Sequence, residues 1–570
     1  MIVNPYAVSY SAIRVRYLLR ETREISVRYL LRETRPSGAA HKRYLTLISR
    51  LFLMLLASSV GCGTAGRVGA PATAEPASGK LAQIEHAEAE ATAKWNTESY
   101  DAVVENEFQD ALSNPQSTFA IDVDTASYGI VRRKLHEGFL PPSGAVRIEE
   151  LVNYFHYEYA PLHDAHPFSV QVDAGDCPWN QGHRLVRIAV KGKEPPANEV
   201  LPSNLVFLLD VSGSMNQPDK LPLAKSALSL LLGKLTAADR ISIVTYAGAS
   251  GVVLAPTRGD RSAEISAALN SLVPSGGTDG AQGIELAYQL AESNFLASGN
   301  NRIILCTDGD FNLGVTNQSE LISLIERKAK SGVFLTVLGF GTGNYKDSTM
   351  EKLADKGNGN YAYIDSFQEA RKVLVEKISA TLVAIAQDVK IQIDVNPHFI
   401  SAYRLIGYEN RLLSREDFRD DSKDAGEIGA GHTVTAFYEV VPAGQPSPAR
   451  KAAESEFVNS IAKLDGDSTA ALTVNLRYKL PMANASQEFQ IRLPGQELKS
   501  PSQTTVDFRF ASSVVVFGML LRESKHAGSA SWNWVIETAQ ANRGSDTDGS
   551  RTEFIELAKT ARALQARIRR

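Results

Sequence analysis

The sequence predicts a doubly wound α/β domain inserted into a β-sandwich, with a small α/β unit before it and helices after it. Two observations support this prediction. Between residues 204 and 385 unbroken apolar runs alternate with helical segments, whereas the segments on either side alternate apolar and polar residues. Buried parallel strands form unbroken apolar runs because helices cover both faces of their sheet, and half-buried antiparallel strands alternate.

Length and composition set the domain count and exclude some functions. A chain of 570 residues is too long for one core of ordinary size, so several folded parts are expected. The formal charge of -4 offers no general attraction to nucleic acid, and we expect no nucleic-acid partner. No uncharged apolar run reaches about 18 residues, which argues against a polytopic membrane protein. The predicted parts are residues 1–40, spurious or unstructured; 41–62, a signal peptide; 63–96, a flexible tether; 97–160, the N-terminal α/β unit; 161–203 with 386–500, the β-sandwich; 204–385, the doubly wound domain; and 501–570, a C-terminal helical segment.

The first residues are typical of a targeting signal. Residues 15–23 recur word for word as 27–35, and two copies are too few for a solenoid. Residues 41–62 then combine basic residues, a short apolar run and small residues directly before Cys62, which is the layout of a secretory signal. The end of this segment resembles a bacterial lipobox, so Cys62 is the predicted lipid anchor. Ser59 stands where a lipobox usually has Leu, which leaves a plain secretory signal as the alternative.

The composition after Cys62 turns to Ala, Gly, Pro, Thr and Glu, with few large apolar residues to bury. We therefore expect residues 63–96 to tether a folded head to a lipid. Such a protein would work in the cell envelope, on the periplasmic side of the outer membrane or on another extracytoplasmic surface. The membrane would be engaged through the lipid anchor only.

The folded part is predicted element by element from its periodicity. The N-terminal unit is expected to hold a helix over 100–112, a strand over 117–122 and helices over 128–135 and 148–155. The sandwich strands are expected over 168–173, 185–191, 389–395, 433–441 and 472–480. The doubly wound domain is expected to hold strands over 205–209, 241–246, 302–307, 333–340 and 361–364, and helices over 220–235, 263–272, 281–297, 319–331, 348–356 and 367–383. A closing helix is expected over 552–562.

Several side chains that carry oxygen atoms lie just after predicted strands, or in loops, at three places in the doubly wound domain. In open parallel sheets, ligands collect just beyond the carboxyl ends of the strands, at the switch point. Carboxylate and hydroxyl oxygens are hard ligands that suit Mg²⁺, Mn²⁺ or Ca²⁺. The sequence therefore predicts a divalent-cation site, with Mg²⁺ preferred and Mn²⁺ or Ca²⁺ as alternatives. Its expected ligands are Asp210, Ser212, Ser214, Thr278 and Asp308.

The motif Asp-x-Ser-x-Ser, followed by a Gly-Gly-Thr loop and a strand-terminal Asp-Gly, resembles the metal-ion-dependent adhesion site of von Willebrand factor type A domains. All five ligand positions match. The resemblance implies a Rossmann-like fold for residues 204–385 and a metal with one position open for an Asp or Glu carboxylate of a partner protein. Because few carboxylates bind the ion directly, its charge is incompletely neutralised, and this favours capture of an outside carboxylate.

The flanking segments 119–128, 407–411 and 420–432 are similar to the YfbK-like family of bacterial A-domain lipoproteins. This similarity extends from about residue 97 to the end of the chain. It implies the architecture of a lipid-anchored A-domain protein more than it implies a function. From this architecture together with the cation site, we expect a protein that binds a partner and is not an enzyme. An alternative is a structural envelope protein whose metal serves stability alone.

A second alternative is a metal-dependent phosphohydrolase, because Asp122 and Asp124 after an apolar strand resemble the nucleophile and acid of haloacid-dehalogenase-type phosphatases. Those enzymes have Thr or Val where this chain has Ala126, and no convincing Lys or second acidic motif accompanies the pair. We favour the interpretation that the two carboxylates cap the helix beginning near Ser127 or hold a structural cation. Asp122 and Asp124 are therefore the candidate second cation site.

Three further features have ordinary interpretations. An acidic cluster is favoured as a solvated loop over a calcium site, because its spacing lacks the EF-hand pattern and Lys423 interrupts it. Cys306 lies in an apolar run and is predicted to be a buried strand residue; it and Cys177 are taken as free thiols. His432 has no visible metal companion and is assigned to packing or a hydrogen bond. The members of the acidic cluster are Glu416, Asp417, Asp420, Asp421 and Asp424.

Overall fold

The computed structural model of the chain describes most of the residues from 97 onward. The predictions for the signal peptide, for Cys62 and for the tether fall outside the described residues. Among the helices that are described, none has the length and apolar character needed to cross a bilayer. The described residues are 97–121, 124–159, 166–194, 201–277, 280–310, 318–376, 383–421, 423, 425–449, 469–481, 483, 485–499, 501 and 504–569.

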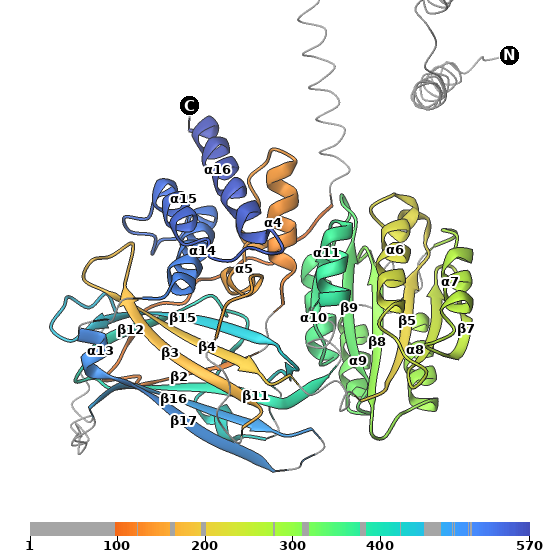
Figure 1. Cartoon of the computed structure of the whole chain (residues 1–570), viewed down its shortest axis with the longest axis horizontal. Coiled ribbons are helices and arrows are strands. Elements are labelled where there is room, and N and C mark those ends of the chain that lie inside the picture. The colour runs from red at the N-terminus through yellow and green to blue at the C-terminus, as the bar shows by residue number, and fades with distance from the viewer. Residues whose placement is uncertain are drawn as a thin grey trace, which may run out of the picture. The chain divides into compact units, whose positions relative to one another are not determined.

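The doubly wound domain is built on one sheet with the strand order β10-β9-β8-β5-β6-β7 (Figure 1). Its neighbouring strands are parallel except for β6 and β7, which are antiparallel. All five predicted strands are confirmed. The sixth, β7, was not predicted because it is an edge strand with several exposed side chains. The strands are β5 (Ser203–Asp210), β6 (Arg240–Tyr246), β7 (Ser250–Arg258), β8 (Asn300–Thr307), β9 (Phe334–Phe340) and β10 (Tyr361–Ile364).

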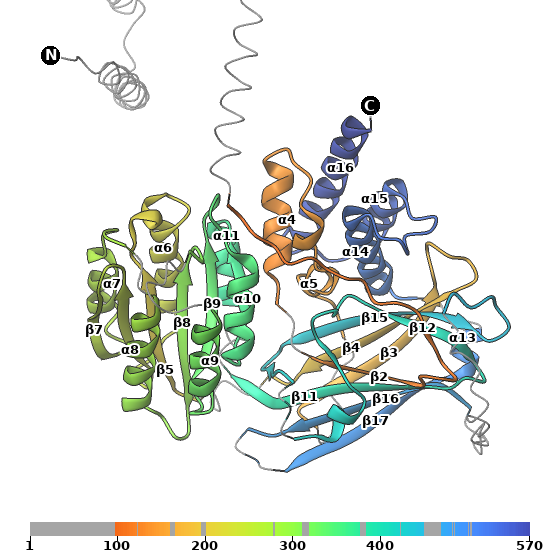
Figure 2. The same ribbon diagram turned by 180° about the vertical axis from the view of Figure 1, so that it is seen from behind.

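Helices cover both faces of this sheet (Figure 2). In β5, Leu205 and Phe207 pack in the core with α6, α7 and α11, whereas Val206 and Leu208 pack in the core with α8, α9 and α10. This two-sided burial explains the unbroken apolar run of β5. The helices are α6 (Leu221–Leu232), α7 (Ser262–Ser271), α8 (Gly280–Ser293), α9 (Gln318–Ala329), α10 (Asp347–Lys356) and α11 (Phe367–Arg371), the last continuing as the π-helical turn Lys372–Glu376.

The sandwich consists of two antiparallel sheets that enclose an apolar core, with side chains such as Ile391 and Tyr438 fully buried in it. Strand β4 precedes the doubly wound domain and β11 follows it, so the predicted insertion is confirmed. One sheet has the order β1 (Gln109–Asp110), β12 (Ile400–Ile406), β15 (Thr433–Pro442), β4 (Arg184–Gly192), β3 (Phe168–Asp176). The other has the order β13 (Leu412–Leu413), β2 (Gln116–Ala120), β11 (Ala384–Val395), β16 (Ala470–Lys479), β17 (Ser486–Pro494), with β14 (Ile428–Gly429) paired to β11.

The N-terminal segment differs from the small α/β unit that was predicted. The helix expected over 100–112 is wrong, because the segment is extended and its strand β1 pairs with β12. Val104 and Leu112, which contributed to the helical spacing, are 82% and 62% exposed. The side chain of Asn106 instead donates to the carbonyls of Leu405 and Gly407. Strand β2 likewise pairs with β11, so the segment completes both sandwich sheets.

Helices α4 (Ala126–His136) and α5 (Ile148–Asn153) link the N-terminal segment to its neighbours: α4 lies against β10, and α5 packs on α14 and β15. The chain closes with helices, as predicted. Thr505 caps α14 by accepting a hydrogen bond from the backbone of Phe508, and α14 packs against α15 in a core rich in aromatic side chains. These helices are α13 (Gly495–Lys499), α14 (Val506–Arg522), α15 (Trp532–Ala541) and α16 (Ser550–Ile568).

Candidate functional site

The carboxyl ends of β5 and β8 lie side by side at the centre of the parallel sheet. The chain leaves β5 toward β6 on one side and later returns to β8 on the other, which makes this the switch point of the sheet. Asp210 ends β5 and Asp308 directly follows β8. Both side chains are fully buried. The structure therefore brings together two predicted ligands that are almost a hundred residues apart in sequence.

The loop after β5 is folded around the carboxylate of Asp210. Its Oδ1 accepts a hydrogen bond from the backbone N–H of Ser212 at 2.8 Å, and its Oδ2 accepts one from Oγ1 of Thr307 at 3.2 Å. The hydroxyls of Ser212 and Ser214 lie 3.0 Å apart. Oxygens at adjacent corners of an octahedron with metal–oxygen distances of about 2.1 Å are separated by about 3.0 Å. The two hydroxyls are hydrogen-bonded to each other, and the same separation is compatible with two neighbouring ligands of one Mg²⁺ ion.

A second loop is tied to the first by two backbone hydrogen bonds. Gly213 donates to the carbonyl of Gly276 at 3.2 Å, and Ser275 donates to the carbonyl of Val211 at 2.7 Å. Gly276 has a φ of +77°, a left-handed conformation that glycine adopts without strain. The chain thus reaches the serine loop just before Thr278, which itself lies outside the described residues.

Two residues that the sequence did not single out, Lys220 and Asn344, bind Asp308. The ammonium of Lys220 donates to Oδ2 of Asp308 at 2.9 Å, and the amide of Asn344 donates to the same oxygen at 3.0 Å. The Lys220 side chain is buried against Gly341, whose φ of +83° and tight contact leave no room for a Cβ. No local pattern marks Lys220 or Asn344 in the sequence, because their partner belongs to another strand end.

The two carboxylates differ in how their charge is compensated. Burial raises the pKa of Asp210 to about 6, and the negative charge of Asp308 adds to this effect against the hydrogen bonds from Ser212. Burial also acts to raise the pKa of Asp308, but the neighbouring Lys220 outweighs it and the pKa falls below its usual value. Among the described residues, no cationic side chain pairs with Asp210. This set of two carboxylates and two hydroxyls fits a divalent cation.

The raised pKa of Asp210 predicts a pH effect on the metal-free chain. The folded state holds the proton of Asp210 more tightly than the unfolded state, so stability is lost as pH rises from about 4 to about 6. Asp210→Asn has no carboxyl group at this position, so we expect it not to lose stability over this pH range. At about pH 7 its unfolding free energy should exceed that of the original chain by about 3 kcal/mol. Urea denaturation in EDTA at about pH 4 and at about pH 7 measures this difference in unfolding free energy. A difference that does not change with pH would contradict the assignment.

The candidate second cation site is an ion-pair cluster. Oxygens of Asp124, Glu150 and Glu351 lie within 4.8 Å of one another. However, Asp124 accepts from the backbone of Tyr361 at 2.6 Å and pairs with Arg411 at 3.1 Å. The cluster is therefore already supplied with donors. Asp122 lies outside the described residues.

Asp124, which was expected to cap the following helix or to hold a cation, makes its described hydrogen bond and ion pair with residues outside that helix. The residue before α4 makes no side-chain cap hydrogen bond, and it is Glu150 that accepts from the backbone N–H of Ser127, at 2.8 Å. The Oδ1 atom of Asp124 accepts a hydrogen bond from the backbone N–H of Tyr361, the first residue of β10. This partner is 237 residues away in sequence, which is why local capping rules pointed elsewhere.

The remaining predicted features have ordinary structural roles. In the acidic cluster, Asp421 accepts hydrogen bonds from Arg477 and Ser486, so its charge is compensated by the protein without a metal ion. Asp424 lies outside the described residues. Cys177 and Cys306 are buried free thiols, as predicted. His432 lines a pocket that lies between the doubly wound domain and the sandwich.

Comparisons with known protein families agree with this architecture. The family described as "Uncharacterized protein YfbK, C-terminal" matches residues 380–564. The families described as "von Willebrand factor" and "von Willebrand factor type A domain" match residues 94–187 and 205–310. Among solved structures, the von Willebrand factor type A protein from Catenulispora acidiphila is 17% identical with a TM-score of 0.39, over 68% of this chain and 89% of its own.

Two curated relatives show the range of similarity. A protein of Synechocystis named "Uncharacterized protein sll0103" is 32% identical over 35% of this chain and 46% of its own length. "Uncharacterized protein YfbK" of Escherichia coli (strain K12) is 40% identical over 488 residues, which is 84% of each chain. The chain therefore belongs to the YfbK family of proteins with a von Willebrand factor type A domain.

Proposed function

We propose that the switch point of the parallel sheet binds a divalent cation, preferably Mg²⁺, and presents it to an Asp or Glu carboxylate of a partner protein. The cation would be held by Asp210, Ser212, Ser214, Thr278 and Asp308. The observation that carries this proposal is the pair of serine hydroxyls 3.0 Å apart beside two buried carboxylates, one of which, Asp210, has no cationic partner among the described residues.

The surroundings of the site suit a partner that approaches from solvent. Gly213 and Asn216 on the first loop, and residues 275–277 on the second, are exposed, whereas the carboxylates beneath them are buried. Hydroxyl ligands carry no charge, so a bound ion would keep much of its positive charge toward the open side. An incoming carboxylate is the natural complement of such an ion.

We favour binding over catalysis. The phosphohydrolase alternative depends on Asp124 as an acid or ligand, but that carboxylate accepts from the backbone of Tyr361 and pairs with Arg411. We also propose that the head is held in the cell envelope by a lipid on Cys62. Metabolic labelling with a palmitate analogue, with Cys62→Ser as the control, tests the anchor: label that persists in the variant would exclude it.

Substitution of a single ligand separates a binding site from a stabilising one. In Ser212→Ala we expect Mg²⁺ to bind at least about tenfold more weakly, a loss of about 1.4 kcal/mol. EDTA-sensitive capture of a partner from envelope extracts should be lost as well. Melting of the metal-free chain should be unchanged, since only one hydroxyl is removed.

The matched control is Ser226→Ala, an exposed serine on α6 whose hydroxyl donates to the carbonyl of Pro222. It should retain both Mg²⁺ binding and capture. If Mg²⁺ raises the melting temperature of the original chain but no partner is captured in a metal-dependent way, the site is structural and the adhesion proposal fails.

A further inference from the structure

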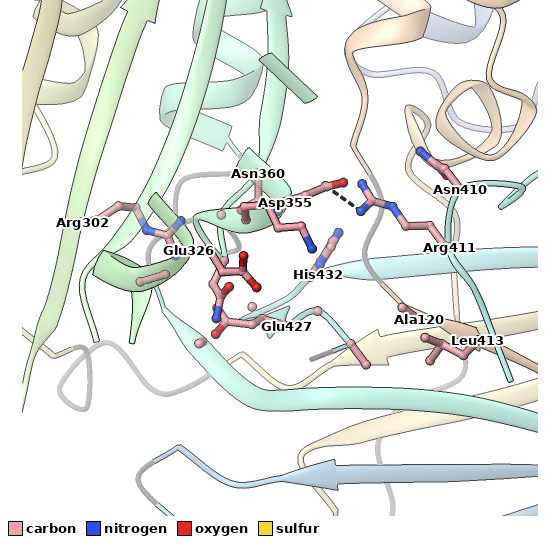
Figure 3. A pocket seen from close by; sticks show the side chains of 18 of the residues that line it. Ala120, Arg302, Glu326, Asp355, Asn360, Asn410, Arg411, Leu413, Glu427 and His432 are labelled. Carbon is pink, nitrogen blue, oxygen red and sulfur yellow. Dashed lines mark ion pairs between the residues drawn. The ribbon is translucent and has the colours of Figure 1, made fainter. Parts of the chain in front are cut away.

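A polar pocket of about 450 Å³ lies between the doubly wound domain and the sandwich. Its walls on one side come from the start of β8, the end of α9 and the turn between α10 and β10. On the other side they come from residues 410–413 and 425–432 (Figure 3). The pocket is at the amino end of β8, the opposite end from the predicted cation site. The two sites are therefore separate in space.

Arg302, the third residue of β8, is buried in the wall of this pocket, with 3% of its surface exposed. Its Nη1 donates to Oγ1 of Thr336 at 2.7 Å, and its guanidinium lies over the ring of Phe334. Nε is buried and has no acceptor among the described residues. Figure 3 shows the guanidinium extending toward the pocket.

The unused edge of this guanidinium is the one that binds oxyanions best. Nε–H and Nη2–H point in the same direction and together match the two oxygens of a carboxylate or phosphate. Thr336 accepts from Nη1, and no described residue accepts from the Nε and Nη2 edge. Arg302 forms no ion pair with a described carboxylate; Glu427 acts on it only through its longer-range charge.

Leaving this guanidinium without a counter-ion is costly, because a buried cation is stabilised only by paired charge and hydrogen bonds. Burial lowers the pKa of Arg302 to about 10, which reflects that cost. At neutral pH the side chain is still protonated. An anion that entered the pocket would supply both the missing charge and the missing acceptors.

We propose that this pocket binds a small ligand with one oxyanionic group, a carboxylate or a phosphate, held by Nε and Nη2 of Arg302. Exposed Lys330 and Lys356 at the same pocket would attract such a ligand. Glu326 and Glu427 also line the pocket and disfavour a polyanion. The ligand would contact the doubly wound domain and the sandwich together.

Titration of the full chain with inorganic phosphate and, separately, with acetate in chloride buffer tests the proposal. We expect at least one probe to bind saturably with a dissociation constant of about 1 mM or tighter. In Arg302→Gln and in Arg302→Lys, which keeps the charge but loses the fork, binding should weaken at least about tenfold. Binding of only one probe identifies the oxyanion as phosphate or carboxylate.

The control is Arg240→Gln, which changes an exposed arginine at the first position of β6, two strands away from β8 in the same sheet, and should bind the probe normally. Mg²⁺ binding should be the same in all these chains, so failure here is distinct from failure of the cation site. Absence of saturable binding by both probes, or equal binding by the Arg302 variants and the original chain, would overturn the proposal.

Discussion

Replacing Arg147 by Met is expected to lower the free energy of unfolding by about 3–5 kcal/mol, as for other buried ion pairs that lose one partner. Arg147 is buried between two parts of the fold. It donates to both oxygens of Asp347, at 2.6 and 3.2 Å, and pairs with Glu150. Glu351 lies close by, and burial already raises its pKa to about 8. Without the guanidinium, the carboxyl groups of Asp347, Glu150 and Glu351 would lie close together in the interior without the positive charge of Arg147.

Urea denaturation at about pH 7 measures the loss, with Arg258→Met as the control because exposed pairs contribute only about 0–1 kcal/mol. Arg258 pairs with Asp260, and both side chains are exposed. Arg147→Lys keeps the positive charge but cannot donate two parallel hydrogen bonds to the carboxylate of Asp347. It should therefore lose less unfolding free energy than Arg147→Met. If Arg147→Met costs no more than the control, the ion pair does not hold the N-terminal segment to the doubly wound domain.

Replacing Lys220 by Met is expected to tighten Mg²⁺ binding by about tenfold to a hundredfold, since hydrogen bonds to charged groups contribute about 1.5–3 kcal/mol. The ammonium of Lys220 lies 2.9 Å from Oδ2 of Asp308 and places a fixed positive charge beside the predicted ion. Its removal takes away the positive charge that competes with the cation for Asp308 and leaves the neutral amide of Asn344 on Oδ2. The metal-free variant should be less stable, because Asp308 then remains buried without a counter-charge.

Calorimetric titration compares this variant with Lys234→Met, which removes an exposed lysine beyond the far end of α6. The control should bind Mg²⁺ as the original chain does. Mg²⁺ binding that is unchanged or weaker in Lys220→Met would show that the lysine supports the ion instead of competing with it for Asp308.

The fold was largely predictable because its signals are periodic and local. The strand expected over 361–364 coincides with β10, and the two-sided burial of β5 made its apolar run unambiguous. The meeting of Asp210 and Asp308 was predictable for a related reason. Parallel strands place their carboxyl ends at one edge of the sheet, so residues that follow two such strands approach each other.

What could not be predicted depends on partners that are distant in sequence. Arg147 meets Asp347 across 200 residues, and Lys220 meets Asp308 across 88. No spacing rule connects such pairs. The helix prediction around Asn106 was wrong for the opposite reason. The segment has a local helical spacing, but its hydrogen bonds to β12 and to the turn after β12 hold it extended. Tertiary contacts of this kind outweigh a weak local preference.

The most direct test of the central claim is a titration of Mg²⁺ into the metal-free full-length chain and into Asp210→Asn. We expect saturable binding to the original chain and its loss in the variant, which should remain folded because Asn keeps the acceptor for the Ser212 N–H. Absence of Mg²⁺ binding to the original chain, or equal affinity in both chains, would contradict a cation site at Asp210.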